Sequence, residues 1–132
     1  MSLSNKSITP EQSDILETLV EAFSETQEGF SITRSDSHGI WILVGRAPGL
    51  PDDWDLWNPW IEDDHAFKLL IEFRVSLEFY KGEVMSFIRD GFTCQTLVVF
   101  RVLFEDYESP EEAVRAAIVE TVHKYVLLDR EQ

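Results

Sequence analysis

Residues 52–64 combine tryptophan with acidic side chains. Trp54, Trp57 and Trp60 recur at every third position, and no lysine or arginine lies between Arg46 and Lys68. The acidic residues of this segment are Asp52, Asp53, Asp55, Glu62, Asp63 and Asp64. Exposed tryptophan beside charge is typical of interface hot spots. The expected partner-binding surface therefore consists of Trp54, Trp57, Trp60, Asp52, Asp53 and Asp55.

The same tryptophans have a second interpretation, in which they close one end of the hydrophobic core. Indole rings are large and often cover the edges of a core. The two interpretations are compatible, because one ring can pack while another reaches out to a partner.

A second set of carboxylates follows helical spacing near the N-terminus. Asp14, Glu17, Glu21, Glu25 and Glu28 are separated by three or four residues, and no basic residue lies between Lys6 and Arg34. Carboxylates one helical turn apart lie about 5–6 Å from each other, which is close to the spacing of backbone phosphates. The stripe is therefore a candidate nucleic-acid mimic that acts through Glu17, Glu21 and Glu25. The alternative is a solvated helix face.

Catalytic and metal-binding patterns are weak. No two of the histidines, His38, His65 and His123, have the i, i+4 spacing of a metal site with an additional acid. His65, among Glu62, Asp63 and Asp64, is the best single candidate for a ligand. No phosphate-binding glycine loop and no nucleophile motif is recognisable. We therefore predict no cofactor, no metal and no catalytic residue, and an enzyme is the less favoured interpretation.

The single cysteine and the net charge limit the expected compartment and the expected class of partner. Cys94 is the only cysteine, so an intrachain disulfide is excluded and a reducing cytoplasm is expected. Cys94 lies in a strand-like run, which predicts a packed, inert thiol. Neither a secretory signal nor a membrane-spanning run is expected. The net charge of −14 argues against direct binding of nucleic acid or an anionic membrane and favours a basic protein as partner.

Three helices are predicted, and two of them begin with capping boxes. Thr9-Pro10-Glu11-Gln12 and Ser109-Pro110-Glu111-Glu112 each combine a hydroxyl N-cap, a proline at the first helical position and Gln or Glu at the third. They start helices over residues 10 to about 26 and 110 to about 128. A third helix is expected from residue 63 to about residue 80. Its apolar positions, which predict a central and largely buried element, are Ala66, Phe67, Leu69, Leu70, Ile71, Phe73, Val75 and Leu77.

Four strands are expected, at residues 30–34, 40–45, 83–89 and 93–105. Turn residues 36–39 and the Asp90-Gly91 pair predict two antiparallel hairpins. Residues 40–44 and 96–104 are apolar on both alternating faces, which is typical of strands covered on both sides. Residues 52–59 are expected to form a loop, because Pro51 and Pro59 lack backbone donors.

These elements predict a mixed α/β (α+β) fold with the order α-β-β-α-β-β-α. Helices on both faces of a four-stranded, mainly antiparallel sheet would form a three-layer α/β/α sandwich. A chain of 132 residues is expected to form one globular domain, over residues 9–128. Residues 1–8 are expected to be disordered, and residues 129–132 to form a polar tail.

Two segments resemble the phage ABA sandwich domain family. Trp57-Asn58-Pro59, followed by Asp64-His65-Ala66-Phe67, is similar to the loop and helix start of that family, and residues 109–117 resemble its last helix. The resemblance covers residues 57–126, and Trp60 departs from it, because a small hydroxyl residue is expected there. It implies a three-layer sandwich and a phage or prophage setting, and it transfers no activity to any residue.

The favoured function is a small, acidic, non-enzymatic binding protein of phage or prophage type. Its expected partner is a basic host protein, which it would inhibit or occupy as a nucleic-acid mimic. One alternative is a small-molecule-binding domain or enzyme with a ligand site under the tryptophan-rich segment. The other alternative is an oligomeric structural component.

Overall fold

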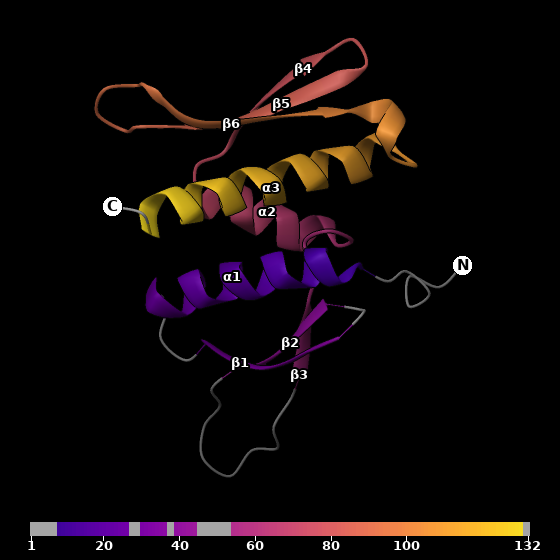
Figure 1. The fold of residues 1–132 in the computed structure, drawn as a ribbon, viewed down its shortest axis with the longest axis vertical. Helices are drawn as coiled ribbons and strands as arrows, with labels where there is room; N and C mark the ends of the chain where they lie inside the picture. The colour runs from indigo at the N-terminus through magenta and orange to yellow at the C-terminus, as the bar shows by residue number, and fades with distance from the viewer. Residues whose placement is uncertain (1–7, 27–29, 37–38, 45–53, 131–132) are drawn as a thin grey trace. The chain divides into compact units, whose positions relative to one another are not determined.

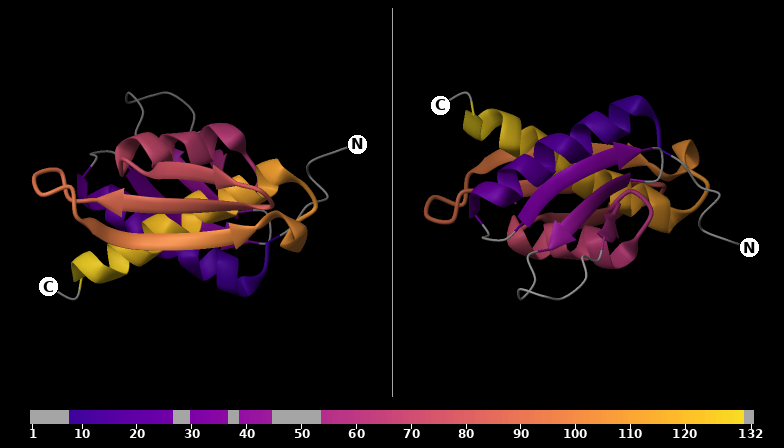
Figure 2. Two further views of the ribbon diagram at one scale, coloured as in Figure 1. Left: turned by 90° about the horizontal axis from the view of Figure 1, so that it is seen from above. Right: turned by 90° about the horizontal axis from the view of Figure 1, so that it is seen from below.

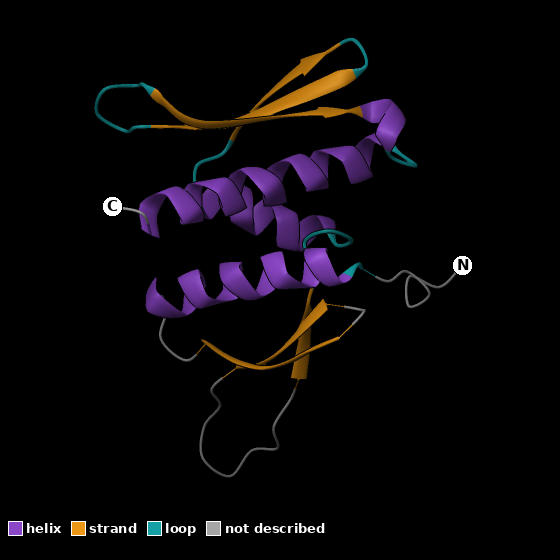
Figure 3. Cartoon of the chain, in the orientation of Figure 1, coloured by secondary structure: helices purple, strands orange, loops and turns teal. Residues whose placement is uncertain are grey.

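A computed structural model describes residues 8–26, 30–36, 39–44 and 54–130. The backbone divides into two compact units, Met1–Asn58 and Pro59–Gln132, and each is described by itself. Within the described ranges the chain forms three α-helices and two three-stranded antiparallel sheets, so the fold is of the mixed α+β class (Figures 1 and 3). Of the segment expected to be disordered, residues 1–7 lie outside these ranges and Ile8 is buried. Of the expected tail, residues 131–132 lie outside these ranges, and Asp129 and Arg130 belong to the last helix.

The first unit contains helix α1 (Pro10–Thr26) and strands β1 (Phe30–Asp36), β2 (Gly39–Val44) and β3 (Trp54–Trp57). The predicted capping box starts α1: the Gln12 N–H donates to Thr9 Oγ1 over 3.1 Å, and the Thr9 N–H donates to Gln12 Oε1 over 2.9 Å. The helix packs against β1 and β2, and Leu16, Leu19 and Val20 are fully buried. The predicted hairpin of β1 and β2 is confirmed.

Strand β3 corrects the prediction of a loop before Pro59. Trp54 pairs with Leu43 and Trp57 pairs with Ile40, so β3 extends the sheet in the order β1-β2-β3. The sequence Trp-Asp-Leu-Trp has large, strand-favouring residues. Pro59 follows the end of the strand, where it removes no bond from the ladder.

The second unit contains α2 (Asp63–Glu72), β4 (Ser76–Tyr80), β5 (Glu83–Arg89), β6 (Thr96–Leu103), a short 3₁₀ helix, η2 (Phe104–Asp106), and α3 (Pro110–Arg130). The sheet has the order β4-β5-β6 (Figure 2). Its core joins Val84 and Val102 of the sheet to Ala113 and Ala117 of α3, and α2 packs against α3. The predicted strand at residues 83–89 is confirmed.

Helix α2 is shorter and more exposed than predicted. Arg74 takes a left-handed backbone (φ 54°); its N–H donates to the Ile71 carbonyl, and the Val75 N–H donates to the Leu70 carbonyl. These bonds form a Schellman-type helix end that has arginine where glycine is usual, so the sequence carries no clear stop signal. The chain then forms β4, and Phe67 and Ile71 are 59% and 58% exposed.

The prediction of a single four-stranded sheet is wrong for the described residues, which form two separate three-stranded sheets. The expected sandwich layering is not confirmed. The additional strands are β3, expected as loop, and β4, expected as helix. The expectation of one domain over residues 9–128 stays a prediction.

The fourth predicted strand is also shorter, because the β5–β6 turn extends to Gln95. The Asp90 carboxylate accepts the Phe92 and Thr93 N–H groups over 2.8 and 3.0 Å, and this fixes a wide turn. Cys94 lies in this turn with φ 61° and is exposed. The prediction of a packed thiol is therefore wrong.

Candidate functional site

The tryptophan-rich segment is only partly described, and its described rings are buried. Trp57 and Trp60 are 8% and 6% exposed, and Asn58 and Pro59 between them are also buried. Burial supports the packing interpretation for these two rings. Asp52 and Asp53, and the side chains of Trp54 and Asp55, lie outside the description, so the partner-binding prediction for them stays a prediction.

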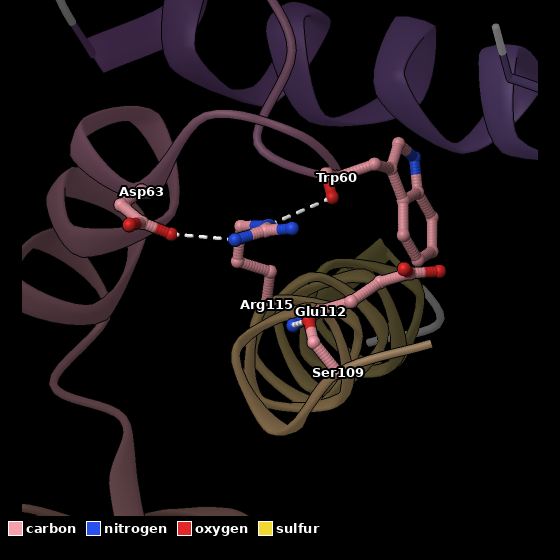
Figure 4. Close-up of polar contacts among 5 residues, drawn as sticks. All are labelled: Trp60, Asp63, Ser109, Glu112 and Arg115. Carbon is pink, nitrogen blue, oxygen red and sulfur yellow. Dashed lines mark hydrogen bonds and ion pairs between the residues drawn. The ribbon is translucent and has the colours of Figure 1, made fainter. Parts of the chain in front are cut away.

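Arg115 of α3 holds the end of this segment (Figure 4). Its Nε donates to the Trp60 carbonyl over 2.9 Å, and its Nη1 contacts Asp63 Oδ1 over 2.6 Å. Near the start of α3, the Glu112 N–H donates to Ser109 Oγ over 3.2 Å, as the predicted N-cap requires. One guanidinium thus connects the segment, the first residue of α2 and α3. Sequence reasoning missed this role.

The acidic stripe of α1 is partly at the surface. Asp14 and Glu21 are exposed, and Glu17 is half-buried. The side chain of Glu25 and the whole of Glu28 lie outside the description. Where they are described, these positions are compatible both with a solvated face and with a contact surface.

The candidate groups for metal binding or catalysis are not brought together. No group of three or more His, Cys, Asp or Glu side chains within the described ranges could hold a metal ion. His65 and His123 lie half-buried on α2 and α3, and His38 is outside the description. In the same part of the chain, no helix is long and apolar enough to cross a membrane.

The second unit exposes large apolar side chains on α2, β4, β6, α3 and the β5–β6 turn. On α2, Phe67 and Ile71 lie one turn apart, with exposed Asp63, Asp64 and Glu72 around them. On β6, Leu97, Val99 and Leu103 are 39%, 42% and 37% exposed. Such residues are typical of surfaces that another molecule covers. The sequence did not indicate the exposure of Phe67 and Ile71. The predicted helix extended into β4, and every apolar residue of that helix was assigned to the core.

Ionisable groups lie beside β6. Lys124 of α3 donates from Nζ to the Val99 carbonyl over 3.2 Å and lies over the Phe100 ring. Burial raises the pKa of the Glu120 carboxyl, one turn earlier, and Lys124 partly opposes this shift. Burial, followed by the charge of Glu120, raises the pKa of Tyr107. Both shifts stabilise the neutral form of the acid relative to its charged form.

Compared with known proteins, the chain matches no family model, no curated protein and no solved structure. Any functional conclusion therefore depends on the surfaces just described.

Proposed function

We propose that the protein is a small, acidic, non-enzymatic binding protein that binds a basic host protein in the cytoplasm. The observation that carries the proposal is the exposed Phe67–Ile71 pair on α2, with Asp63, Asp64 and Glu72 around it. Apolar anchors surrounded by charge are the arrangement expected of a protein-binding surface. Exposed Lys68 also lies beside the pair, and Asp63 is paired with Arg115. The preference for a basic partner therefore rests mainly on the net charge of the chain.

The charge of the chain supports the same partner class. A net charge of −14 attracts basic proteins over several ångströms and speeds their encounter, while the apolar anchors slow dissociation. In one form of this proposal, the stripe that includes Glu17, Glu21 and Glu25 imitates nucleic-acid phosphates for a basic nucleic-acid enzyme.

A phage or prophage setting is the second part of the proposal. Its support is the resemblance of residues 57–67 and 109–117 to the phage ABA sandwich domain family. In this chain Arg115 of the second segment bonds to Trp60 and Asp63, which lie within the first. The sandwich layering that the resemblance implies stays a prediction.

Affinity capture from a bacterial lysate tests the binding proposal. The wild type should retain a basic protein at low salt and lose most of it at about 0.5 M salt, where charges are screened within a few ångströms. Replacement of Phe67 and Ile71 by serine should reduce capture. Leu127→Ser is the matched control, because Leu127 is also exposed, at 43%, but lies on α3. Equal capture by both variants would contradict the assignment to α2.

Charge reversal tests the mimic form separately. Replacement of Glu17, Glu21 and Glu25 by lysine should abolish binding of a nucleic-acid enzyme. The side chains of Glu17 and Glu21 are not buried, so their replacement should leave the fold intact. Unchanged binding would exclude the mimic while leaving the α2 surface in place.

A further inference from the structure

One hydrogen bond at the end of β6 shows which of its residues direct their backbone groups toward β5 and which direct them away from it. The Phe104 N–H donates to the Gly82 carbonyl over 3.0 Å, one position beyond the Glu83–Leu103 pair. Residues of an antiparallel ladder alternate between bonding to their neighbour and facing away from it. Val98, Phe100 and Val102 therefore bond toward β5. The backbone groups of Val99, Arg101 and Leu103 face the other side, whereas Leu97 lies at a register shift in the ladder.

The contact of Lys124 supports this phase, because its Nζ reaches the Val99 carbonyl from α3 over 3.2 Å. Among the described strands, β6 has a neighbour on one side only, and Figure 2 shows it as an outer strand of its sheet. Strand β6 has eight residues and no proline. Short length, proline and bulges are devices that usually prevent an edge from pairing. Strand β6 is not short and has no proline, and its irregularity is confined to Leu97, near the N-terminal end.

The edge has an acidic end. Glu105, Asp106, Glu108 and Glu111 follow β6 and are all exposed. At the other end, the turn over residues 90–95 contains one acid, Asp90, whose carboxylate already accepts two backbone N–H groups. Positive charge on a bound strand is therefore favoured beside the C-terminal end of β6.

We propose that the free edge of β6 binds an extended segment of a basic protein by antiparallel strand addition. Main-chain bonds form to Val99, Arg101 and Leu103, and a donor from the incoming strand replaces Lys124 at the Val99 carbonyl. In antiparallel pairing, the N-terminal end of the segment lies beside Glu105, Asp106 and Glu108, so its lysines and arginines precede its apolar run. This inference rests on the proposed basic partner and adds its conformation and direction.

A second copy of this chain is the less suitable occupant. Each chain carries a net charge of −14, so two copies repel, whereas a basic segment is attracted. Arg101, the one charged residue of β6, already pairs with Glu83 over 3.4 Å.

Two synthetic peptides of identical composition test direction by calorimetric titration at low salt. One begins with three lysines and continues with alternating valine and threonine, and the other has the lysines last. The first should bind about tenfold more tightly, the effect expected of a few exposed ion pairs. Replacement of Glu105 and Glu108 by lysine should remove this preference. Equal affinity of the two peptides for the wild type would overturn the antiparallel assignment.

The main-chain contact is tested on both partners. Val99→Pro removes an outward N–H and no bond to β5, so it should abolish binding and keep the circular dichroism of the wild type. Val99→Thr is the matched control that keeps the donor. If Val99→Pro does not fold, peptides that are N-methylated at alternate residues test the same contact. Methylation of the N–H groups that face β6 should abolish binding, whereas methylation of the N–H groups on the other side should not. Binding that survives both tests would overturn the edge proposal.

The outcomes separate this inference from the proposed function. A basic lysate protein that wild type and Val99→Pro capture equally would leave the proposed function in place and overturn the edge. Wild type that captures no basic protein, and binds neither peptide, would overturn both. A salt-resistant dimer in sedimentation, lost in Val99→Pro, would assign the edge to a second copy instead.

Discussion

Arg115 of α3 contacts Asp63, the first residue of α2, over 2.6 Å. The side chain of Arg115 is 13% exposed, whereas that of Asp63 is 75% exposed. Glu62, the N-cap of α2, makes no side-chain capping bond. The start of α2 is therefore held by a cation from α3, which also binds the Trp60 carbonyl.

We predict that Arg115→Ala lowers the free energy of unfolding by about 2 kcal/mol, the range for a hydrogen bond to a charged group in a partly buried setting. Arg115→Lys should recover only part of this loss, because one ammonium cannot reproduce two bonds in the directions of Nε and Nη1. Urea denaturation measures both changes.

Arg101→Ala is the matched control for these variants. Arg101 also pairs with a glutamate, Glu83, but its side chain is 64% exposed, so its removal should change stability by less than about 1 kcal/mol. Equal losses from Arg115→Ala and Arg101→Ala would show that the buried contact has no special role.

Local signals allowed much of the secondary structure to be predicted. The Thr9 and Ser109 N-caps and the hairpin at Asp90 depend on side chains that bond to their own backbone neighbours, so short sequence motifs identify them. The end of α2 could not be found in this way, because Arg74 occupies a left-handed position that usually takes glycine. The helix therefore ends at Glu72, and residues 76–80 of the predicted helix form β4 instead.

The candidate surfaces were less predictable than the elements. The exposed edge of β6 depends on which strands pair, and the apolar pattern of residues 96–104 led instead to a covered central strand. The contacts of Arg115 join residues more than fifty positions apart. Its only sequence signal was its position as a lone cation among the apolar residues early in α3.

The turn between β5 and β6 should depend on the ionisation of Asp90. Backbone N–H groups of Thr93 and Phe92 lower the pKa of Asp90 below 3.8. A lowered pKa means that the carboxylate stabilises the fold above pH 3.8 and that this contribution is lost as pH falls through the pKa of the folded state. Asp90→Asn should therefore be less stable than the wild type at pH 7, with the difference shrinking in strong acid. Thermal unfolding across this pH range measures it.

An opposite pH dependence is expected of Glu120. Burial raises its pKa above 4.5, with Lys124 opposing and Tyr107 nearby. The folded state then holds the proton more tightly than the unfolded state, so stability is lost as pH rises from 4.5 through the raised pKa. Glu120→Gln should stabilise the protein at pH 7 and have little effect below pH 4. Glu105→Gln, at an exposed carboxylate, is the control; the same pH profile in both variants would contradict burial as the cause.

Ser86 carries a buried hydroxyl that has no hydrogen-bond partner among the described residues. The residue is fully buried in β5, between Leu77 of β4 and Phe100 of β6. Its carbonyl accepts the Thr121 hydroxyl over 3.4 Å, and this bond does not involve the Ser86 side chain. An unpaired buried hydroxyl costs about 1–3 kcal/mol, so Ser86→Ala should raise the free energy of unfolding by about 1 kcal/mol in urea denaturation.

Ser76→Ala is the control for the Ser86 prediction, because Ser76 lies in the neighbouring strand β4 and is exposed. Its hydroxyl is solvated in the folded and unfolded states, so its removal should change stability by no more than about 0.5 kcal/mol. A loss of stability in Ser86→Ala, with Ser76→Ala unchanged, would mean that the Ser86 hydroxyl has a partner in solution, such as a buried water. A gain confined to Ser86→Ala would show that the centre of the β4-β5-β6 sheet carries an uncompensated polar group.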